Sequence, residues 1–317
     1  MNFEFPPNPK NEQGQLRTVG FEIEFGGVDT RPAAEAVMQA FGGECVAQGP
    51  FRFDVEGTSL GDFSVKLDWR LGQGKKPPNG FLESLDTGVS QLAGSIASVV
   101  VPQEIMAPPI PLDRLSELER LLPLLRRAGA SGTESSLLHA FGLHINPEVP
   151  SFEPRAITAV LKSFALLSPW LWESIKPDMT RRVLGFAKPF NANYVRLVAR
   201  DDYWPDLDRL IDDYVDANPS RNHDLDPLPL FAYLDETRVR NRLPEEKINP
   251  RPTFHYRLPD ARISDPGWCL ASEWNRWVAV ERLAADRARL RLAGEAYLRQ
   301  GSEAKNWAHA ASQFVTA

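Results

Sequence analysis

The segment Thr18–Phe25, TVGFEIEF, constrains the fold of this chain more than any other. Apolar residues fill every second position from 19 to 25, and Glu22 and Glu24 stand between them. This alternation predicts a β-strand with one face in the core, and it places both glutamates on the other face, about 7 Å apart. Carboxylates this close repel each other unless a cation intervenes. The strand therefore either faces solvent or offers Glu22 and Glu24 to a divalent metal.

The remaining segments mix strand and helix patterns without a regular βαβ repeat, which predicts an α+β fold with a mostly antiparallel sheet. Further strands are expected at 51–55, 63–71, 99–106, 136–146 and 254–263. Helices are expected at 31–41, 112–127, 154–172, 206–216 and 272–298, the last with a break near Gly294.

Composition excludes several classes of protein. No run approaches the about 20 apolar residues of a membrane-spanning helix, so no membrane partner is expected. The net charge of −6 argues against a nucleic-acid partner. Two cysteines are too few for a disulfide framework, and no apolar signal segment is visible at the start, so the expected location is cytoplasmic. The P-loop motif and the dinucleotide-binding glycine motif are both missing.

Three regions are expected along the chain. Residues 1–16, which are polar and rich in proline, are expected to form a disordered leader, followed by a folded domain over 17–270. Residues 271–317 are expected to form a C-terminal helical extension, whose tryptophans could pack internally or in a homo-oligomer.

Two further carboxylates stand in predicted strands. Glu104 interrupts the apolar run VVVPQEIM, where a buried carboxylate would require a partner or a metal and an edge position would leave it in solvent. Asp68 has Lys66 and Arg70 on its own face, so a ladder of paired charges is the favoured interpretation there.

Histidine and arginine residues supply candidate phosphate contacts. His144 and Asn146 share one face of the strand in GLHIN, although such a histidine is more often structural. Lys188 lies in a loop and could reach phosphate or simply be exposed. His255 and Arg257 share a face of the late strand, and guanidinium groups suit phosphate. Six arginines occur within 25 residues, with a solvated face as the alternative: Arg238, Arg240, Arg242, Arg251, Arg257 and Arg262.

The ordered set GFEIEF, the Asp68 strand, QEIMAPPIP, GLHIN and the strand with Arg257 resembles the putative amidoligase family. This family belongs to the carboxylate–amine ligase superfamily of glutamine synthetase and glutamate–cysteine ligase. The resemblance covers roughly residues 18–264. It implies that the domain at 17–270 is catalytic, with the sheet curled into a half-barrel funnel and helices on its outer face. It also implies ATP-dependent formation of an amide or isopeptide bond through an acyl phosphate.

The resemblance also implies roles for individual residues. Its substrates would be a carboxylate and an amine, such as a peptide or amino acid, together with ATP and Mg²⁺ or Mn²⁺. The metal ligands would be Glu22, Glu24 and Glu104. ATP would contact Arg257 and His144. Arg262 and Lys188 are further candidates for ATP contacts from the sequence itself, not from the resemblance. The residues closest to the reaction would be Arg257, His255 and Glu24.

Two positions depart from the family pattern. His255 stands where the late strand usually carries glutamate, and Asn146 replaces the second histidine of the GLHxH segment. Imidazole can still bind a divalent cation and favours Mn²⁺ over Mg²⁺. The alternative function is a relative that binds nucleotide or peptide without ligation. A hydrolase with paired carboxylates is less favoured, because Glu22 and Glu24 share one strand rather than flanking a cleft.

Overall fold

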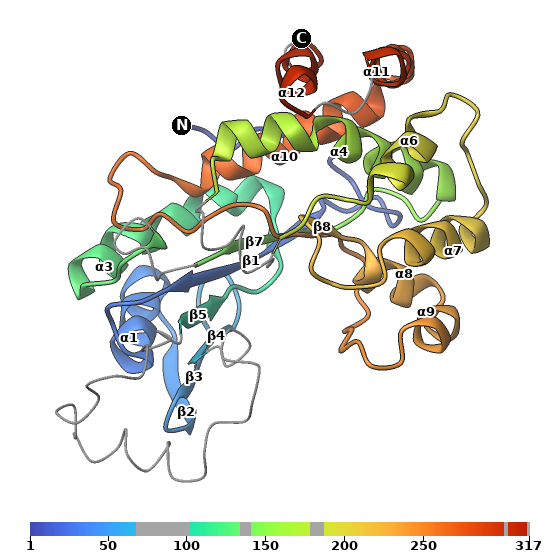
Figure 1. The fold of residues 1–317 in the computed structure, drawn as a ribbon. Helices are drawn as coiled ribbons and strands as arrows, with labels where there is room; N and C mark the ends of the chain where they lie inside the picture. Colours follow the sequence, from blue (N-terminus) through green and yellow to red (C-terminus); the bar gives the residue numbers. More distant parts are fainter. Residues whose placement is uncertain (68–101, 134–140, 178–186, 301–303, 316–317) are drawn as a thin grey trace, which may run out of the picture.

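The computed structural model describes residues 1–67, 102–133, 141–177, 187–300 and 304–315. It confirms an α+β fold built on one antiparallel sheet, in the order β2-β3-β4-β5-β1-β7-β9-β8, with β6 beside β1 (Figure 1). The strands are β1 Thr18–Phe25, β2 Glu44–Gly49, β3 Arg52–Glu56, β4 Phe63–Leu67, β5 Gln103–Met106, β6 Ile110–Pro111, β7 Leu143–Pro147, β8 Leu225–Asp226 and β9 His255–Tyr256.

The central strand β1 has the two faces that its alternation predicts. Its odd-numbered residues from Val19 to Phe25 are at most 1% exposed and join the hydrophobic core. Glu22 and Glu24 point to the other face, yet they are only 7% and 5% exposed. A solvent-facing strand is therefore the wrong interpretation, and the carboxylates belong to a buried polar layer.

The helices pack against the sheet and against one another. They are α1 Thr30–Phe41, α3 Leu121–Ala128, α4 Pro154–Ile175, α6 Ala192–Ala199, α7 Leu207–Ala217, α8 Leu228–Leu234, α9 Glu236–Arg242, α10 Leu270–Ala285, α11 Arg287–Gln300 and α12 Ala304–Ser312. α4 and α10 lie side by side across the middle strands (Figure 1). The Tyr256 ring of β9 contacts Phe164 of α4 and Trp277 of α10, with centroids 5.7 and 5.6 Å apart. This packing leaves the glutamate face of β1 pointing away from α4 and α10.

The predicted helix over 112–127 is divided in two. Residues Leu112–Arg120 form a 3₁₀-helix, η2, and α3 follows directly. Leu112, Leu115 and Leu118 recur every three residues and are buried, which matches the three residues per turn of a 3₁₀-helix. The same spacing also fits an α-helix, so the sequence pattern did not separate the two.

The predicted break near Gly294 is wrong, because the last long helix is interrupted at Asp286 instead. The Asp286 side chain accepts a hydrogen bond from the Arg289 backbone and so caps the start of α11. Gly294 lies inside α11, where an added Cβ would collide with the Ala199 carbonyl oxygen. That glycine permits close packing of α11 on α6 rather than ending a helix.

The other predicted strands are confirmed in part. β3 and β4 pair as the expected hairpin, and the residues expected to extend β4, β5 and β7 at 68–71, 99–101 and 136–140 lie outside the described residues. The strand predicted over 254–263 pairs only at β9, and beyond it single backbone contacts continue, such as that of Gly142 with Asp260. The sequence pattern did not predict β2, α6, α8 or α9.

The first residues of the chain are held by α10. Asn275 accepts a hydrogen bond from the Glu4 backbone, and Trp274 donates one to the Glu4 carbonyl. Arg17 is 1% exposed and forms two hydrogen bonds of 2.7 Å with the Glu281 carboxylate. The leader expected over 1–16 is therefore tied to the helical layer by specific contacts.

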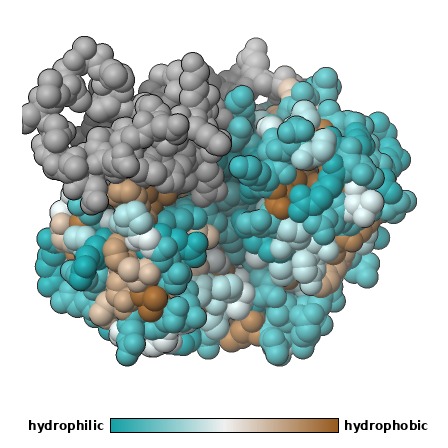
Figure 2. All heavy atoms as spheres, turned by 90° about the horizontal axis from the view of Figure 1, so that it is seen from below, coloured by the Kyte–Doolittle hydropathy of each residue, from teal (hydrophilic) through white to brown (hydrophobic). Residues whose placement is uncertain are grey.

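The face of the molecule seen from below is mainly hydrophilic where its residues are described (Figure 2). On the face seen from below, hydrophobic residues form small separate patches (Figure 2). The most exposed large apolar side chains in the described part are scattered along the chain: Met1, Phe5, Leu16, Val46, Tyr233 and Leu292. Among the described helices, none combines the length and the apolar character needed to cross a bilayer.

Candidate functional site

Strand register gathers the predicted acidic residues on one face of the sheet. In the pairing of β1 with β7, Glu22 stands opposite His144, and in the pairing with β5, Glu24 stands opposite Glu104. Residues opposite each other on neighbouring strands share a face. Residues that are far apart in the sequence therefore meet in one buried layer, in which Glu104 is fully buried.

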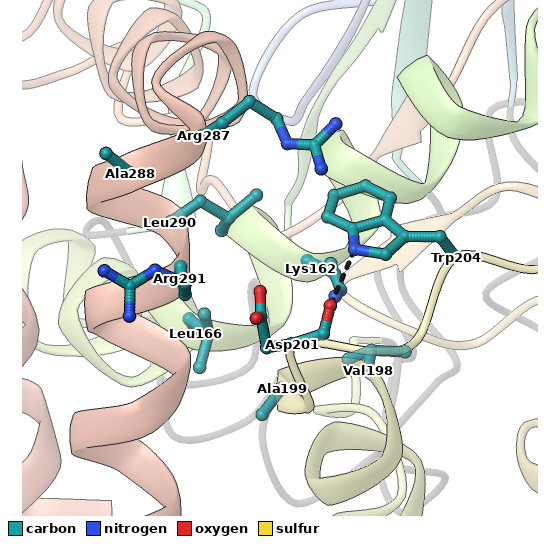
Figure 3. A pocket seen from close by; sticks show the side chains of 10 residues that line it. All are labelled: Lys162, Leu166, Val198, Ala199, Asp201, Trp204, Arg287, Ala288, Leu290 and Arg291. Atoms are coloured by element: carbon teal, nitrogen blue, oxygen red, sulfur yellow. Dashed lines mark hydrogen bonds between the residues drawn. The ribbon is translucent and has the colours of Figure 1, made fainter.

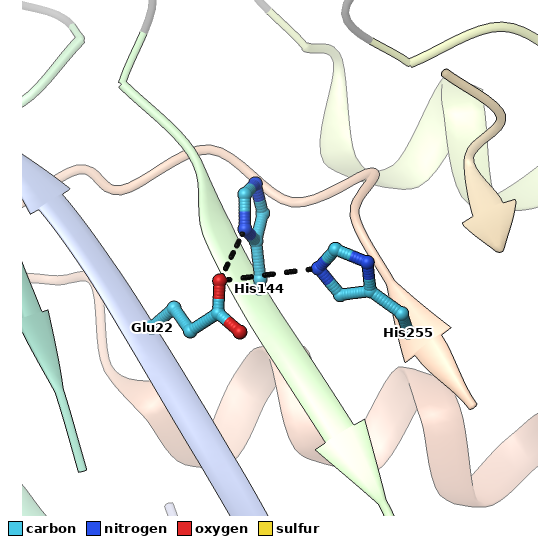
Figure 4. A group of neighbouring side chains, drawn as sticks. All are labelled: Glu22, His144 and His255. Atoms are coloured by element: carbon cyan, nitrogen blue, oxygen red, sulfur yellow. Dashed lines mark hydrogen bonds and ion pairs between the residues drawn. The ribbon is translucent and has the colours of Figure 1, made fainter. Parts of the chain in front are cut away.

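Glu22 lies at the centre of this layer (Figure 4). His144 Nδ1 lies 3.1 Å from its Oε2, and Asn146 Nδ2 donates a 3.1 Å hydrogen bond to its Oε1. Arg251 approaches Oε1 to 3.9 Å and also donates to the Asn146 side-chain oxygen. His255 Nε2 is 4.0 Å from Oε2. The carboxylate thus has imidazole nitrogens on one oxygen and amide and guanidinium donors around the other.

Glu24 and Glu104 form the neighbouring part of the layer. The Gly142 backbone donates a 2.6 Å hydrogen bond to Glu24 Oε2, and His144 Nε2 lies 3.8 Å from Oε1. Lys66 of β4 forms an ion pair of 3.1 Å with Glu104. His144 therefore turns one ring nitrogen toward Glu22 and the other toward Glu24.

His255 is held from its far side by residues that the sequence pattern did not predict. Its Nδ1 lies 3.4 Å from Asp226 Oδ2, and the two residues are paired in the register of β8 and β9. Asp226 is fully buried and accepts a 3.0 Å hydrogen bond from Arg221 Nε. A buried carboxylate is thereby paired with both a guanidinium and an imidazole.

The protonation of the cluster suits metal binding. Burial lowers the pKa of His144 well below 6.5, against the opposing effect of Glu22. Burial likewise lowers the pKa of His255 to about 4, although Asp226 opposes the shift. Burial raises the pKa of Glu22, but its hydrogen bond with His144 and the charge of Arg251 help to keep that pKa well below 4.5. At neutral pH the site therefore offers neutral imidazoles beside a carboxylate.

Two groups of side chains have the composition of divalent-metal sites. One consists of Glu22, His144 and His255, and the other of Glu24, Glu104 and His144, and in each group the ligand atoms lie within 4.8 Å of one another. All five residues are buried, and His255 Nε2 has no hydrogen-bond partner among the described residues. Buried carboxylate and neutral imidazole donors fit a divalent cation such as Mn²⁺.

Of the two arginines predicted to contact phosphate, Arg257 lies near the buried layer and Arg262 lies at the end of α4. Arg257 is close enough for its charge to lower the pKa of both His144 and His255, and its guanidinium donates to the Arg221 carbonyl oxygen. Arg262 instead donates to the carbonyls of Ile175 and Lys176, at 2.7 and 2.9 Å, at the C-terminal end of α4.

The remaining predicted residues give less information about the site. Lys188 is exposed and pairs through its backbone with His223. Asp68 lies outside the described residues, so the predicted charge ladder is represented only by Lys66, whose partner is Glu104.

Several functional candidates were missed or undervalued by sequence reasoning. Asp226 and Arg221 lie in and just before β8, which is only two residues long and therefore too short to show a strand pattern in the sequence. Lys66 was predicted to pair with Asp68 on its own strand, whereas its partner is Glu104 on the neighbouring strand β5. Asn146 could have been paired with Glu22 only if the register of β7 had been known.

A separate cavity of about 240 Å³ lies among α4, α6 and α11 (Figure 3). Its main feature is Trp204, whose ring is flanked at 4.1 Å by Lys162 on one side and Arg287 on the other. Lys162 also donates a 2.7 Å hydrogen bond to the Arg200 carbonyl, at the end of α6. None of the residues of the two metal groups lines this cavity. The contacts of Lys162 with Trp204 and with the Arg200 carbonyl indicate a structural role.

We expect Lys162 to make stability depend on alkaline pH. Burial lowers its pKa from 10.5 to about 8, with Asp201 opposing the shift and Arg287 adding to it. Between these pH values the unfolded chain holds a proton that the folded chain has lost, so folding becomes more favourable as pH rises. The free energy of unfolding in urea should be measured for wild type and Lys162→Met from pH 7.5 to 10.5. We expect wild type to gain stability relative to Lys162→Met steadily as pH rises. A difference that is flat with pH contradicts this assignment.

Comparison with known proteins assigns the chain to a family. No curated protein matches it. The model of a family described as "putative amidoligase enzyme" matches residues 15–279. That range contains β1 to β9 and every residue of the two metal groups. Since the match spans most of the chain and confirms the resemblance seen in the sequence, the chain belongs to the putative amidoligase enzyme family.

Proposed function

We propose that this protein is an ATP-dependent carboxylate–amine ligase that forms an amide or isopeptide bond through an acyl phosphate. Membership in an amidoligase family indicates a ligase-type function. The observation that carries the proposal further is the buried layer of three glutamates and two histidines on one face of the sheet, with Arg251 and Arg257 beside it. Such a layer has the donors for metal ions and the cations for phosphate.

In this proposal Glu22, Glu24, Glu104, His144 and His255 would hold Mg²⁺ or Mn²⁺. The ions would neutralise the phosphate oxygens of ATP. Two imidazoles among the donors favour Mn²⁺, because Mg²⁺ prefers oxygen ligands.

The arginines would act on the transferred phosphoryl group. Arg257 directly follows β9 and Arg251 lies in the segment before it, and both approach the layer, so their guanidiniums would stabilise charge on the phosphate. A carboxylate oxygen of the first substrate attacks the γ-phosphorus, the bond to the bridging oxygen breaks, and ADP leaves. The amine nitrogen of the second substrate then attacks the acyl carbon, and inorganic phosphate leaves.

Other parts of the proposal come from the sequence and the family. The described sheet has β2 and β8 at its edges, and a half-barrel funnel like that of glutamine synthetase is proposed for the whole domain. Lys188 and Arg262 remain predicted ATP contacts. A cytoplasmic location, peptide or amino-acid substrates and a homo-oligomer also remain predictions.

The proposal is tested by incubating the protein with ATP, Mn²⁺ or Mg²⁺, and panels of carboxylates and amines. We expect ADP and phosphate to form only when a suitable carboxylate is present. Hydroxylamine should then trap the acyl phosphate as a hydroxamate. Formation of AMP instead of ADP would refute the acyl phosphate, and nucleotide binding without turnover across the panels would favour the non-catalytic alternative.

A further inference from the structure

Asp226 and Glu22 lie at opposite ring nitrogens of His255. Nδ1 faces Asp226 Oδ2 at 3.4 Å, and Nε2 faces Glu22 Oε2 at 4.0 Å. The short pairing of β8 with β9 sets the first contact, because it places Asp226 directly beside His255. The position of the proton on the His255 ring therefore depends on Asp226 as well as on Glu22.

The donors around Asp226 indicate where the ring proton lies. Its Oδ1 accepts from the Leu228 backbone at 3.0 Å, and its Oδ2 accepts from Arg221 Nε at 3.0 Å. An ionised carboxylate can only accept, so a hydrogen bond between Oδ2 and His255 requires the proton on Nδ1. The neutral ring then has a free lone pair on Nε2.

The opposite tautomer satisfies fewer groups. Arg221 also lies 3.4 Å from His255 Nδ1 and could donate to it. That arrangement would place a proton on Nε2, where Glu22 at 4.0 Å is beyond hydrogen-bond reach. It would also remove one donor from the buried Asp226. Nε2 has no hydrogen-bond partner among the residues described, which agrees with a bare nitrogen aimed at a ligand site.

We propose that Asp226 is a positioning residue that keeps the proton of His255 on Nδ1 and presents Nε2, beside Glu22, to a divalent cation. This inference rests on the metal-binding part of the proposed function. Histidines that bind metals commonly donate their second ring N–H to a carboxylate, which fixes both tautomer and orientation. The arrangement also explains how histidine can stand in β9 where the family pattern has glutamate.

The direct test is Asp226→Asn, which keeps the size of the side chain. The amide has one acceptor oxygen in place of two, so it cannot serve both the Leu228 backbone and the side that faces Arg221 and His255. With the oxygen toward Leu228, the amide nitrogen faces His255. The ring then accepts at Nδ1, and its proton moves to Nε2. We expect Mn²⁺ binding, measured by calorimetry, to weaken about 10- to 100-fold. Unchanged Mn²⁺ affinity would overturn the proposal.

Asp224 provides a matched control two residues earlier. It is also fully buried, but its carboxylate accepts from Ser168 and Trp172 at 2.8 and 3.0 Å. Asp224→Asn therefore removes a buried negative charge from the same segment without touching His255. We expect its Mn²⁺ affinity to equal that of wild type, and an equal loss in both variants would mean that Asp226 has no specific role.

A readout without metal separates this inference from the proposed function. Nitrogen-15 chemical shifts of the His255 ring in the metal-free protein report which nitrogen carries the proton. We expect protonated Nδ1 and bare Nε2 in wild type, and the reverse in Asp226→Asn. A proton on Nε2 in wild type refutes the role of Asp226 even if metal binds. Absence of Mn²⁺ binding in wild type refutes the metal site, and with it the presentation of Nε2 to a cation, whatever the tautomer.

Discussion

Glu22→Gln is expected to lower Mn²⁺ affinity by at least about 100-fold and to abolish metal-dependent release of ADP. Residues behind a metal ligand already contribute about 10- to 100-fold to affinity, so loss of a ligand charge should cost at least as much. Glutamine keeps the size of Glu22 and can still pair with His144 and Asn146, so the fold should persist. Calorimetry with Mn²⁺ and an ADP assay measure the two effects.

The matched control for this variant is Glu117→Gln. Glu117 lies on η2 and pairs with Arg114 at 2.7 Å, and it belongs to neither of the two groups of candidate ligands. It should bind Mn²⁺ and release ADP as wild type does. Full turnover by Glu22→Gln would remove the metal assignment, and loss of its thermal unfolding transition would show that Glu22 is structural.

Arg17→Met should destabilise the fold by about 3–5 kcal/mol, because it leaves the Glu281 carboxylate buried without its counter-charge. Arg17 and Glu281 are nearly inaccessible, and Trp277 is the only other side chain that donates to Glu281 among the contacts described. The free energy of unfolding in urea measures the loss.

Two comparisons isolate the buried charge. Arg282→Met removes an ion pair with Glu4 in which both side chains are 43% exposed, so it should cost less than about 1 kcal/mol. The double variant Arg17→Met/Glu281→Met should be more stable than Arg17→Met alone, since it leaves no unpaired charge. Equal losses in the single and double variants would show that the salt bridge contributes little and that packing around Arg17 dominates.

The sequence predicted which residues lie in the buried layer better than it predicted which of them contact each other. The alternation of β1 was enough to place Glu22 and Glu24 on one face, because period two is a local property of a strand. Their partners depend on register between distant strands, and nothing local in the sequence sets that register. Glu104 and His144 were therefore predicted as candidates without their positions opposite Glu24 and Glu22.

The arginine-rich region shows the same limit. Arg238 and Arg242 form ion pairs with acidic side chains of α7, so for them a partly exposed, paired surface is the correct interpretation. Arg251 and Arg257 lie in the same stretch of sequence but approach the buried layer of glutamates and histidines. Composition could not separate the two groups, because α9 and β9 are too short to show a pattern.

The position of His144 between two carboxylates has a consequence for stoichiometry. A neutral imidazole has one lone pair, and its two nitrogens face Glu22 and Glu24. The ring can therefore coordinate at one group only, unless it gives up its remaining proton. If the proposed site binds two ions, their binding would therefore be linked: the first would have a full ligand set and the second a reduced one, giving two unequal dissociation constants rather than two independent sites.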